Sequence, residues 1–133
     1  MRVQDLLERY QQGERDFAHV DLSGASLSGV NLRDVDLTGA NLTGANLSWA
    51  FLNRANLTGA CLRRADMRSA SLNSIILNQA ILSGADLSKV DLRLAQLQEA
   101  DLNWSVLPEA DLSGANLSGA KLDQINLERA KLN

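Results

Sequence analysis

An apolar residue recurs at every fifth position from residue 17 to residue 132, without a single insertion or deletion. Of these 24 positions, 22 are Leu, and the other two are Phe17 and Met67. A second ladder of small apolar residues, mostly Ala, lies two positions earlier, from Val20 to Ala130. In every five residues, two side chains are therefore predicted to face a core, and three are left for solvent and for a change of chain direction.

A period of five fits neither the 3.6-residue period of an α-helix nor the two-residue period of a flat strand. The chain is therefore expected to turn a corner in every repeat. Gly suits the positive-φ site of a type II turn, but 15 of the 23 complete repeats carry another residue at that position. The sequence thus predicts mixed turn types. The repeats with Gly at the corner are those ending at Gly24, Gly29, Gly39, Gly44, Gly59, Gly84, Gly114 and Gly119.

Units such as Ala110-Asp111-Leu112-Ser113-Gly114 and Ala115-Asn116-Leu117-Ser118-Gly119 resemble the A(D/N)LXX consensus of the pentapeptide-repeat family, in its cyanobacterial form. The resemblance implies an all-β solenoid, a right-handed quadrilateral β-helix with four pentapeptides per coil. The period alone leaves three-sided and four-sided coils open. On this reading residues 17–133 form just under six coils, and at about 4.8 Å per coil the rod is roughly 25–30 Å long.

Residues 1–16 are interpreted as an N-terminal capping helix and a linker. A short helix is predicted from residue 2 to about residue 12, with Gly13 as its stop. Its role is to cover the first coil, because an unpaired edge invites aggregation; the alternative is a helix that docks a partner. The apolar residues on one face of this helix are Val3, Leu6, Leu7 and Tyr10.

At the other end the repeat runs to Leu132, so an exposed coil edge is expected there. Lys121 and Lys131 are interpreted as charges that protect this edge. The alternative is a homodimer in which two chains pair through the uncapped C-terminal coil, a mode that the family resemblance allows.

The candidate interaction surface centres on two aromatic residues at one corner and on a belt of arginines near them. Trp and Arg are common interface anchors, and Arg68 is predicted to reach Trp49 for a cation–π contact. The alternative is that these long side chains lie flat on the rod and cover it. The six residues are Trp49, Phe51, Arg54, Arg63, Arg64 and Arg68.

Two further surface features are open to interpretation. Cys61, Ile76 and Ile81 fall on neighbouring columns and form either a small apolar patch or ordinary scattered apolar surface. Pro108 cannot donate a backbone hydrogen bond, so a bulge or a lost ladder bond is expected beside it.

The composition argues against catalysis and against cofactor or metal binding. The chain has one histidine, His19, and one cysteine, Cys61, about two coils apart on this reading, and no metal-type spacing of Cys and His. A filled axis with convex sides offers no pocket in which catalytic groups converge. The net charge of −3 argues against direct nucleic-acid binding. The N-terminus has no apolar signal segment and no run is long enough to span a bilayer, so a cytoplasmic location is expected.

The function predicted from these features is a non-catalytic structural scaffold or protein-interaction module with an unknown protein partner. The alternative, implied by the resemblance alone, is a DNA-mimic protein that binds a type II topoisomerase. The sequence departs from that alternative because it is short, only mildly acidic, and interrupted by the arginines between Arg54 and Arg68.

Overall fold

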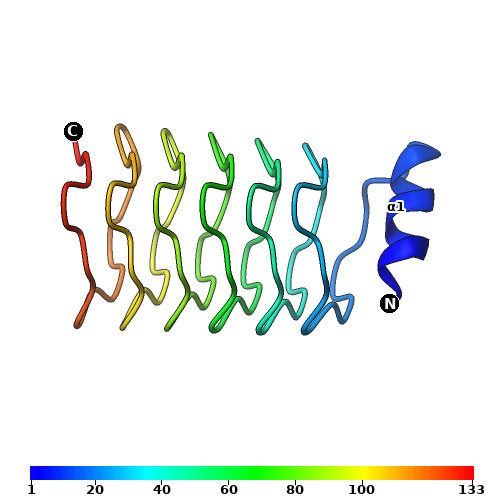
Figure 1. The fold of residues 1–133 in the computed structure, drawn as a ribbon, viewed down its shortest axis with the longest axis horizontal. Helices are drawn as coiled ribbons and strands as arrows, with labels where there is room; N and C mark the ends of the chain where they lie inside the picture. The colour runs from blue at the N-terminus through cyan, green and yellow to red at the C-terminus, as the bar shows by residue number, and fades with distance from the viewer.

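The computed structural model describes all residues from 1 to 133 and consists of one helix followed by a rod of stacked coils (Figure 1). Helix α1 spans Val3–Gln11. From residue 16 onward, parallel bridges join each repeat to the repeat 20 residues later, from Asp16 with Asp36 to Asp111 with Lys131. Four pentapeptides therefore complete one turn, and the fold is a right-handed β-helix solenoid, as predicted.

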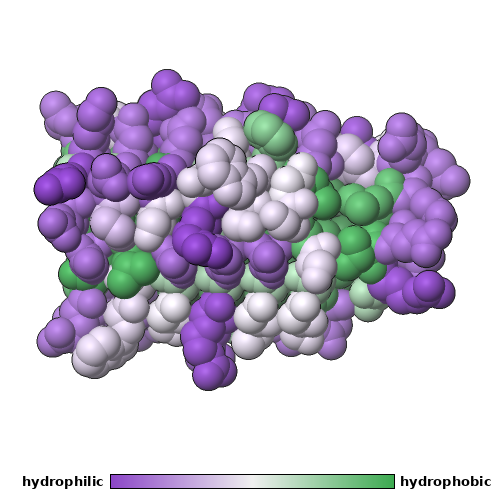
Figure 2. Space-filling view, in the orientation of Figure 1, coloured by the Kyte–Doolittle hydropathy of each residue, from purple (hydrophilic) through white to green (hydrophobic).

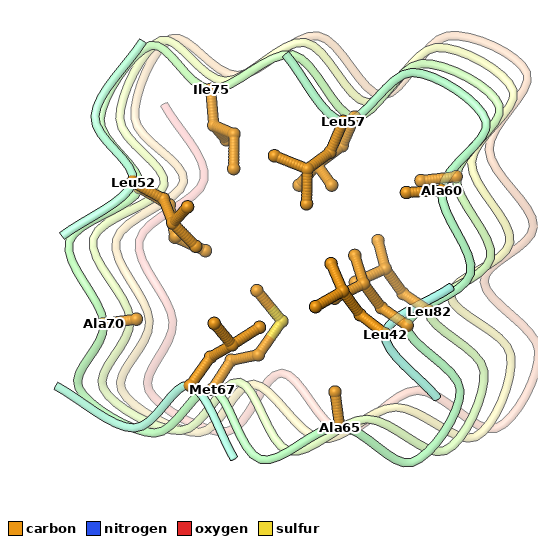
Figure 3. Close-up of a cluster of buried hydrophobic side chains, with 14 of the residues drawn as sticks. Leu42, Leu52, Leu57, Ala60, Ala65, Met67, Ala70, Ile75 and Leu82 are labelled. Carbon is orange, nitrogen blue, oxygen red and sulfur yellow. The ribbon is translucent and has the colours of Figure 1, made fainter. Parts of the chain in front are cut away.

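Each coil has four walls, and each wall turns one Leu-type and one Ala-type side chain toward the axis (Figure 3). Leu57 and Ile75 lie on one wall, while Met67 and Ala65 face them from the opposite wall. The buried residues form one continuous cluster from Leu6 to Leu112. Because a fully buried Leu side chain contributes roughly 1.5–3 kcal/mol, the two inward ladders supply most of the drive for coiling.

The prediction of mixed turn types is wrong. The corner residue has a positive φ in all 23 repeats, from +55° at Arg64 to +74° at Gly114. At every corner from His19 to Glu109 the N–H donates to the next coil, as Trp49 N–H does to the Arg68 carbonyl at 2.9 Å, whereas the four corners of the last coil have no coil to donate to. An L-residue in this conformation costs roughly 1–2 kcal/mol, but the hydrogen bonds to the stacked coils hold the backbone in place whichever residue is present.

The polar residue before each Leu has a structural task. At all 14 repeats with Asp or Asn in this position, its side-chain Oδ1 accepts a hydrogen bond from the backbone N–H two residues later, for example from Thr38 to Asp36 at 2.9 Å. This N–H lies in the turn and takes no part in the coil-to-coil ladder. The Asp or Asn side chain therefore satisfies a donor that the fold leaves open.

The expected defect at Pro108 is absent. Val106 bridges Asp86 on one side and Asn126 on the other, and the Pro108 carbonyl still accepts from Lys89 N–H at 2.9 Å. In most repeats the N–H at the position of Pro108 is capped by an Asp or Asn side chain two residues earlier. In this repeat the residue two positions earlier is Val106, which cannot accept a hydrogen bond through its side chain. Removing that N–H leaves no donor unsatisfied, and Pro is also favoured at this place in a type II turn.

Helix α1 covers the first coil with the face predicted for it. Leu6 is fully buried, and Val3, Leu7 and Tyr10 are partly buried against the core. The Tyr10 hydroxyl donates to the Arg33 carbonyl at 2.7 Å. The helix starts one residue later and ends one residue earlier than predicted; at nine residues it is far too short to cross a membrane.

Polar side chains cover most of the side of the rod shown in Figure 2, and apolar surface gathers mainly where α1 meets the first coils. The charged residues stand on the outside of the walls and at the corners. The functional surface must therefore be sought among outward side chains, because inward ones fill the axis.

Candidate interaction surface

A shallow hollow of about 320 Å³ opens on the outside of the rod around one corner. The 20-residue register stacks Trp49, Ser69 and Lys89 in one column at this corner. The residues that precede them in the chain form a second column beside it. Ser69 has a small side chain, so a gap remains between the indole and the lysine, which are two coil steps, about 10 Å, apart along the rod. The hollow is lined by Ser48, Trp49, Arg68, Ser69, Ser88 and Lys89.

Trp49 presents most of its indole to solvent, with 66% of the residue exposed. It sits at a corner with φ +61°, and the wall of the rod curves away on either side of it. The indole N–H makes no hydrogen bond within the chain, since Trp49 takes part only through its backbone. A flat apolar face with a free donor at its edge is suited to contact another molecule.

The predicted cation–π contact between Arg68 and Trp49 is not formed. The Arg68 guanidinium instead makes a two-point contact with Asp66 in its own repeat, at 2.7 and 2.9 Å, and lies 4.0 Å from Asp86. The hydrogen bond from Arg68 lowers the pKa of the Asp66 carboxyl and raises the pKa of Arg68. Bidentate pairing of opposite charges is stronger than an exposed cation–π contact, so Asp66 holds the arginine.

Lys89 is the cation of the hollow that remains free, because its ammonium lies within 4.0 Å of no carboxylate. Its backbone is fixed by the hydrogen bond from its N–H to the Pro108 carbonyl. The hydroxyl of Ser69 also has no hydrogen-bond partner in the chain, whereas Ser48 and Ser88 donate to Asn46 and Asp86. The hollow therefore carries three unused donors, those of Trp49, Ser69 and Lys89.

The other predicted site residues lie apart from the hollow. Phe51 is stacked beneath the Arg33 guanidinium, 4.4 Å from the ring centroid, and Arg54 forms an ion pair with Asp34 at 2.8 Å. Arg63 and Arg64 belong to the repeat before that of Arg68, on the neighbouring wall, and are free of acidic partners. The arginines thus wrap around the rod and do not form one basic face. Of the six predicted residues, the hollow brings together only Trp49 and Arg68.

Sequence reasoning missed Lys89, Ser69 and Ser88, although a signal for them was present. Each lies 20 or 40 residues from Trp49 or Ser48, so the coil register would have placed them on the same two columns. Of the other large apolar side chains that are prominently exposed, Trp104 and Leu94 also stand at corners, at 67% and 60% exposure. Neither of them lines a hollow with a free cation.

Cys61 occupies the position that Asp or Asn holds in most repeats. Its sulfur lies 3.1 Å from the Thr43 hydroxyl and 4.0 Å from Arg63 Nη1. Partial burial raises the pKa of the Cys61 thiol, but hydrogen bonds from Thr43 and from the Arg63 backbone, with the Arg63 charge, outweigh burial and lower it below its ordinary value. Cys61 and Ile81 bridge each other on one wall, while Ile76 lies on the wall beside it; all three are half-buried. No group of three or more metal-ligating side chains is clustered anywhere in the chain.

The geometry defines a class of protein: a parallel β-solenoid built from five-residue units, with a filled axis and outward side chains set on a regular register. Residues 16–54, 41–73, 60–95 and 95–133 match the family model described as pentapeptide repeats, in eight copies. The chain therefore belongs to the pentapeptide-repeat family. No curated protein sequence matches it.

Solved structures similar to this one are pentapeptide-repeat proteins. Rfr23 from the cyanobacterium Cyanothece 51142 is 26% identical, with a TM-score of 0.73 over 98% of this chain and 99% of that one. A pentapeptide-repeat protein of the Arabidopsis thaliana thylakoid lumen is 30% identical, with a TM-score of 0.63 over 74% and 66% of the two chains. A trypsin-treated substitution variant of QnrB1, a plasmid-mediated fluoroquinolone resistance protein, is 22% identical, with a TM-score of 0.51 over 87% and 67% of the two chains, which shows a shared fold alone.

Proposed function

We propose that this protein is a non-catalytic interaction scaffold, a rod of just under six coils that docks a protein partner against the hollow at Trp49. Pentapeptide-repeat proteins are generally structural or interaction modules. The observation that carries the proposal is the combination of an exposed indole with unused donors on a rod whose axis is filled. A filled axis leaves only the outer surface for binding, and this hollow combines a largely exposed indole with a free cation and a free hydroxyl.

The test is co-purification from extracts of the source cells, with the tagged full chain as bait. Trp49→Ala is compared with Trp104→Ala, because both tryptophans stand at corners and are equally exposed. A discrete partner that is retained by Trp104→Ala and lost by Trp49→Ala supports the proposal. Equal recovery by both variants places docking elsewhere, and no specific partner for the wild-type chain argues against the scaffold function.

A type II topoisomerase as partner of a DNA mimic receives less support. The likeness to QnrB1 concerns the fold, and the net charge of this chain is only −3. A duplex mimic needs an extended negative surface, yet Arg63, Arg93 and Arg129 put positive charge on three different walls. A supercoiling assay decides the matter, because a mimic inhibits or protects the enzyme and a scaffold with another partner leaves its activity unchanged.

A second copy of this chain is the proposed partner of the coil that contains residues 115–132. Leu122 and Leu132 are 39% and 56% exposed there, and the backbone N–H groups of Leu117, Leu122 and Leu127 donate no hydrogen bond. Light scattering at several concentrations tests this, with Leu127→Lys as the variant expected to leave a monomer.

We also propose that the protein acts in the cytoplasm, where the lone cysteine, Cys61, stays a free thiol.

A further inference from the structure

We propose that the hollow between Trp49 and Lys89 binds an acidic side chain of a peptide segment, with the apolar neighbour of that side chain resting on the indole. This inference rests on the proposed function and names the chemistry of the partner at the same surface. It follows from which polar groups of the hollow are still free.

The free groups of the hollow are hydrogen-bond donors. The Lys89 ammonium and the Trp49 indole N–H can only donate, and the Ser69 hydroxyl can donate as well as accept. The remaining polar groups are already engaged: Ser48 with Asn46, Ser88 with Asp86, and Arg68 with Asp66. A ligand that pairs with these donors must therefore bring hydrogen-bond acceptors. A carboxylate provides acceptors and also carries the negative charge that complements Lys89.

The dimensions favour a single side chain with its immediate neighbour. Two coil steps separate the indole from the lysine, about 10 Å along the rod. A carboxylate at Lys89 and an apolar residue on Trp49 are then spaced as adjacent or next-but-one residues of an extended peptide are, at about 3.3–3.6 Å per residue plus the reach of their side chains.

A nucleic-acid strand fits this surface less well. Asp66 and Asp86 lie beside the hollow, and Glu109 follows Lys89 at the same corner one coil further on. A strand brings one phosphate per nucleotide and would place several charges against these carboxylates, whereas a single carboxylate brings one charge, which Lys89 can offset. The chain as a whole is also negative, which weakens binding of any polyanion.

The chain contains its own matched reference at Trp104. This residue is 67% exposed, against 66% for Trp49, and its corner φ is +65° against +61°. The residue 20 positions after Trp104 is Gln124, and the residues 20 and 40 positions before it are Gly84 and Arg64. This corner thus also has a cation two coils from the indole, but no hydroxyl lies between the two and no hollow opens there. General stickiness of an exposed tryptophan would affect both residues alike.

The experiment follows the two indole ¹⁵N–¹H signals of the labelled full chain by NMR. The probes are a capped tetrapeptide of sequence GELG, its neutral counterpart GQLG, and a hexathymidylate oligonucleotide. The expected result is a saturable shift of the Trp49 signal with GELG while the Trp104 signal stays in place. GQLG, or GELG with the Lys89→Gln chain, is expected to bind about two- to fivefold more weakly, as suits one exposed charge pair.

The control variant is Lys121→Gln, which makes the same change in net charge on another wall and is expected to bind GELG like the wild type. The inference is overturned if both indole signals shift together, if GELG and GQLG bind equally, if only the oligonucleotide binds, or if no peptide shifts the Trp49 signal. Should the peptides fail while Trp49→Ala still loses the co-purified partner, the scaffold function stands and only the acidic chemistry of the partner is wrong.

Discussion

The side chain of Leu94 lies over the α-carbon of Gly114, one coil further along the rod, so that a Cβ on residue 114 would stand 2.8 Å from Leu94 Cδ2. Glu99 and Arg64 lean in the same direction, over Gly119 and Gly84. At these corners a long side chain is accommodated because the next residue in its column has no side chain of its own.

Gly114→Ala is therefore expected to destabilise the rod more than Gly44→Ala. Both substitutions put an L-residue at positive φ, at a cost of roughly 1–2 kcal/mol, but nothing lies near a Cβ at Gly44. At residue 114 the Leu94 side chain must also leave its rotamer, which adds about 0.5–1.5 kcal/mol. Urea denaturation measures the difference. In a Leu94→Ala background the two substitutions should cost the same, and a persisting gap would contradict the contact.

Leu72→Asp is expected to abolish folding. The residue is fully buried in the Leu ladder, and a carboxylate placed there has no partner and costs several kcal/mol even if it is protonated. Leu72→Ala, which removes volume without adding charge, should cost about 2–5 kcal/mol. Circular dichroism with urea titration checks both. A Leu72→Asp chain that keeps the wild-type spectrum and midpoint would refute the inward position of the ladder.

The stability of the rod is expected to fall as the pH drops below about 5. The hydrogen bond from Arg93 lowers the pKa of Asp91 below its ordinary value near 3.8, and Arg68 does the same for Asp66. In this range the unfolded chain binds more protons than the folded one, so acid favours unfolding. The contribution is complete above the ordinary value and is lost as the pH falls through the lower, folded value.

Asp91→Asn is the matched variant for this effect, because an amide oxygen still caps the turn N–H but does not titrate. Its melting temperature should fall less than that of the wild type between pH 7 and pH 3. If the two chains lose the same amount, the acid sensitivity arises from other carboxylates.

The rate at which the Cys61 thiol reacts with iodoacetamide is expected to rise with pH, and the midpoint of this rise should lie below the ordinary thiol pKa. The thiolate is the reacting form, and hydrogen bonds from Thr43 and the Arg63 backbone outweigh the effect of burial on the pKa. Arg63→Ala removes the nearby positive charge and should shift the midpoint upward, while Arg129→Ala, at a distant corner, should leave it unchanged. An Arg63→Ala profile that matches the wild type would show that the charge plays no part.

The repeat made the inward surface of this protein predictable, because burial of Leu and Ala at a strict period of five leaves few alternatives. The capping helix was predictable because Leu6 and its apolar neighbours lie on one face of a helix, and that face must be buried against the first coil. The backbone at the corners was not: residue preference argues against positive φ at Trp49 or Glu109, yet the hydrogen bonds of the stack override that preference.

The surface was predicted less well because it depends on which neighbour a long side chain selects. Arg68 pairs with Asp66 in its own repeat although Trp49 is in the adjoining coil. Pro108 was expected to damage the ladder, but its N–H would have taken no part in it. Lys89 could have been placed beside Trp49 by counting 40 residues along the sequence, since the coils keep their register throughout.

The unbroken 20-residue register turns the outside of the rod into a grid, in which a residue number fixes both a height and a wall. Changing an outward side chain leaves the axis and its hydrogen bonds as they were, so recognition can be altered one grid point at a time while the folding energy stays in the Leu and Ala ladders. A binding pattern can accordingly be moved along the rod by adding 20 to each of its residue numbers, and each such step displaces it by a single coil.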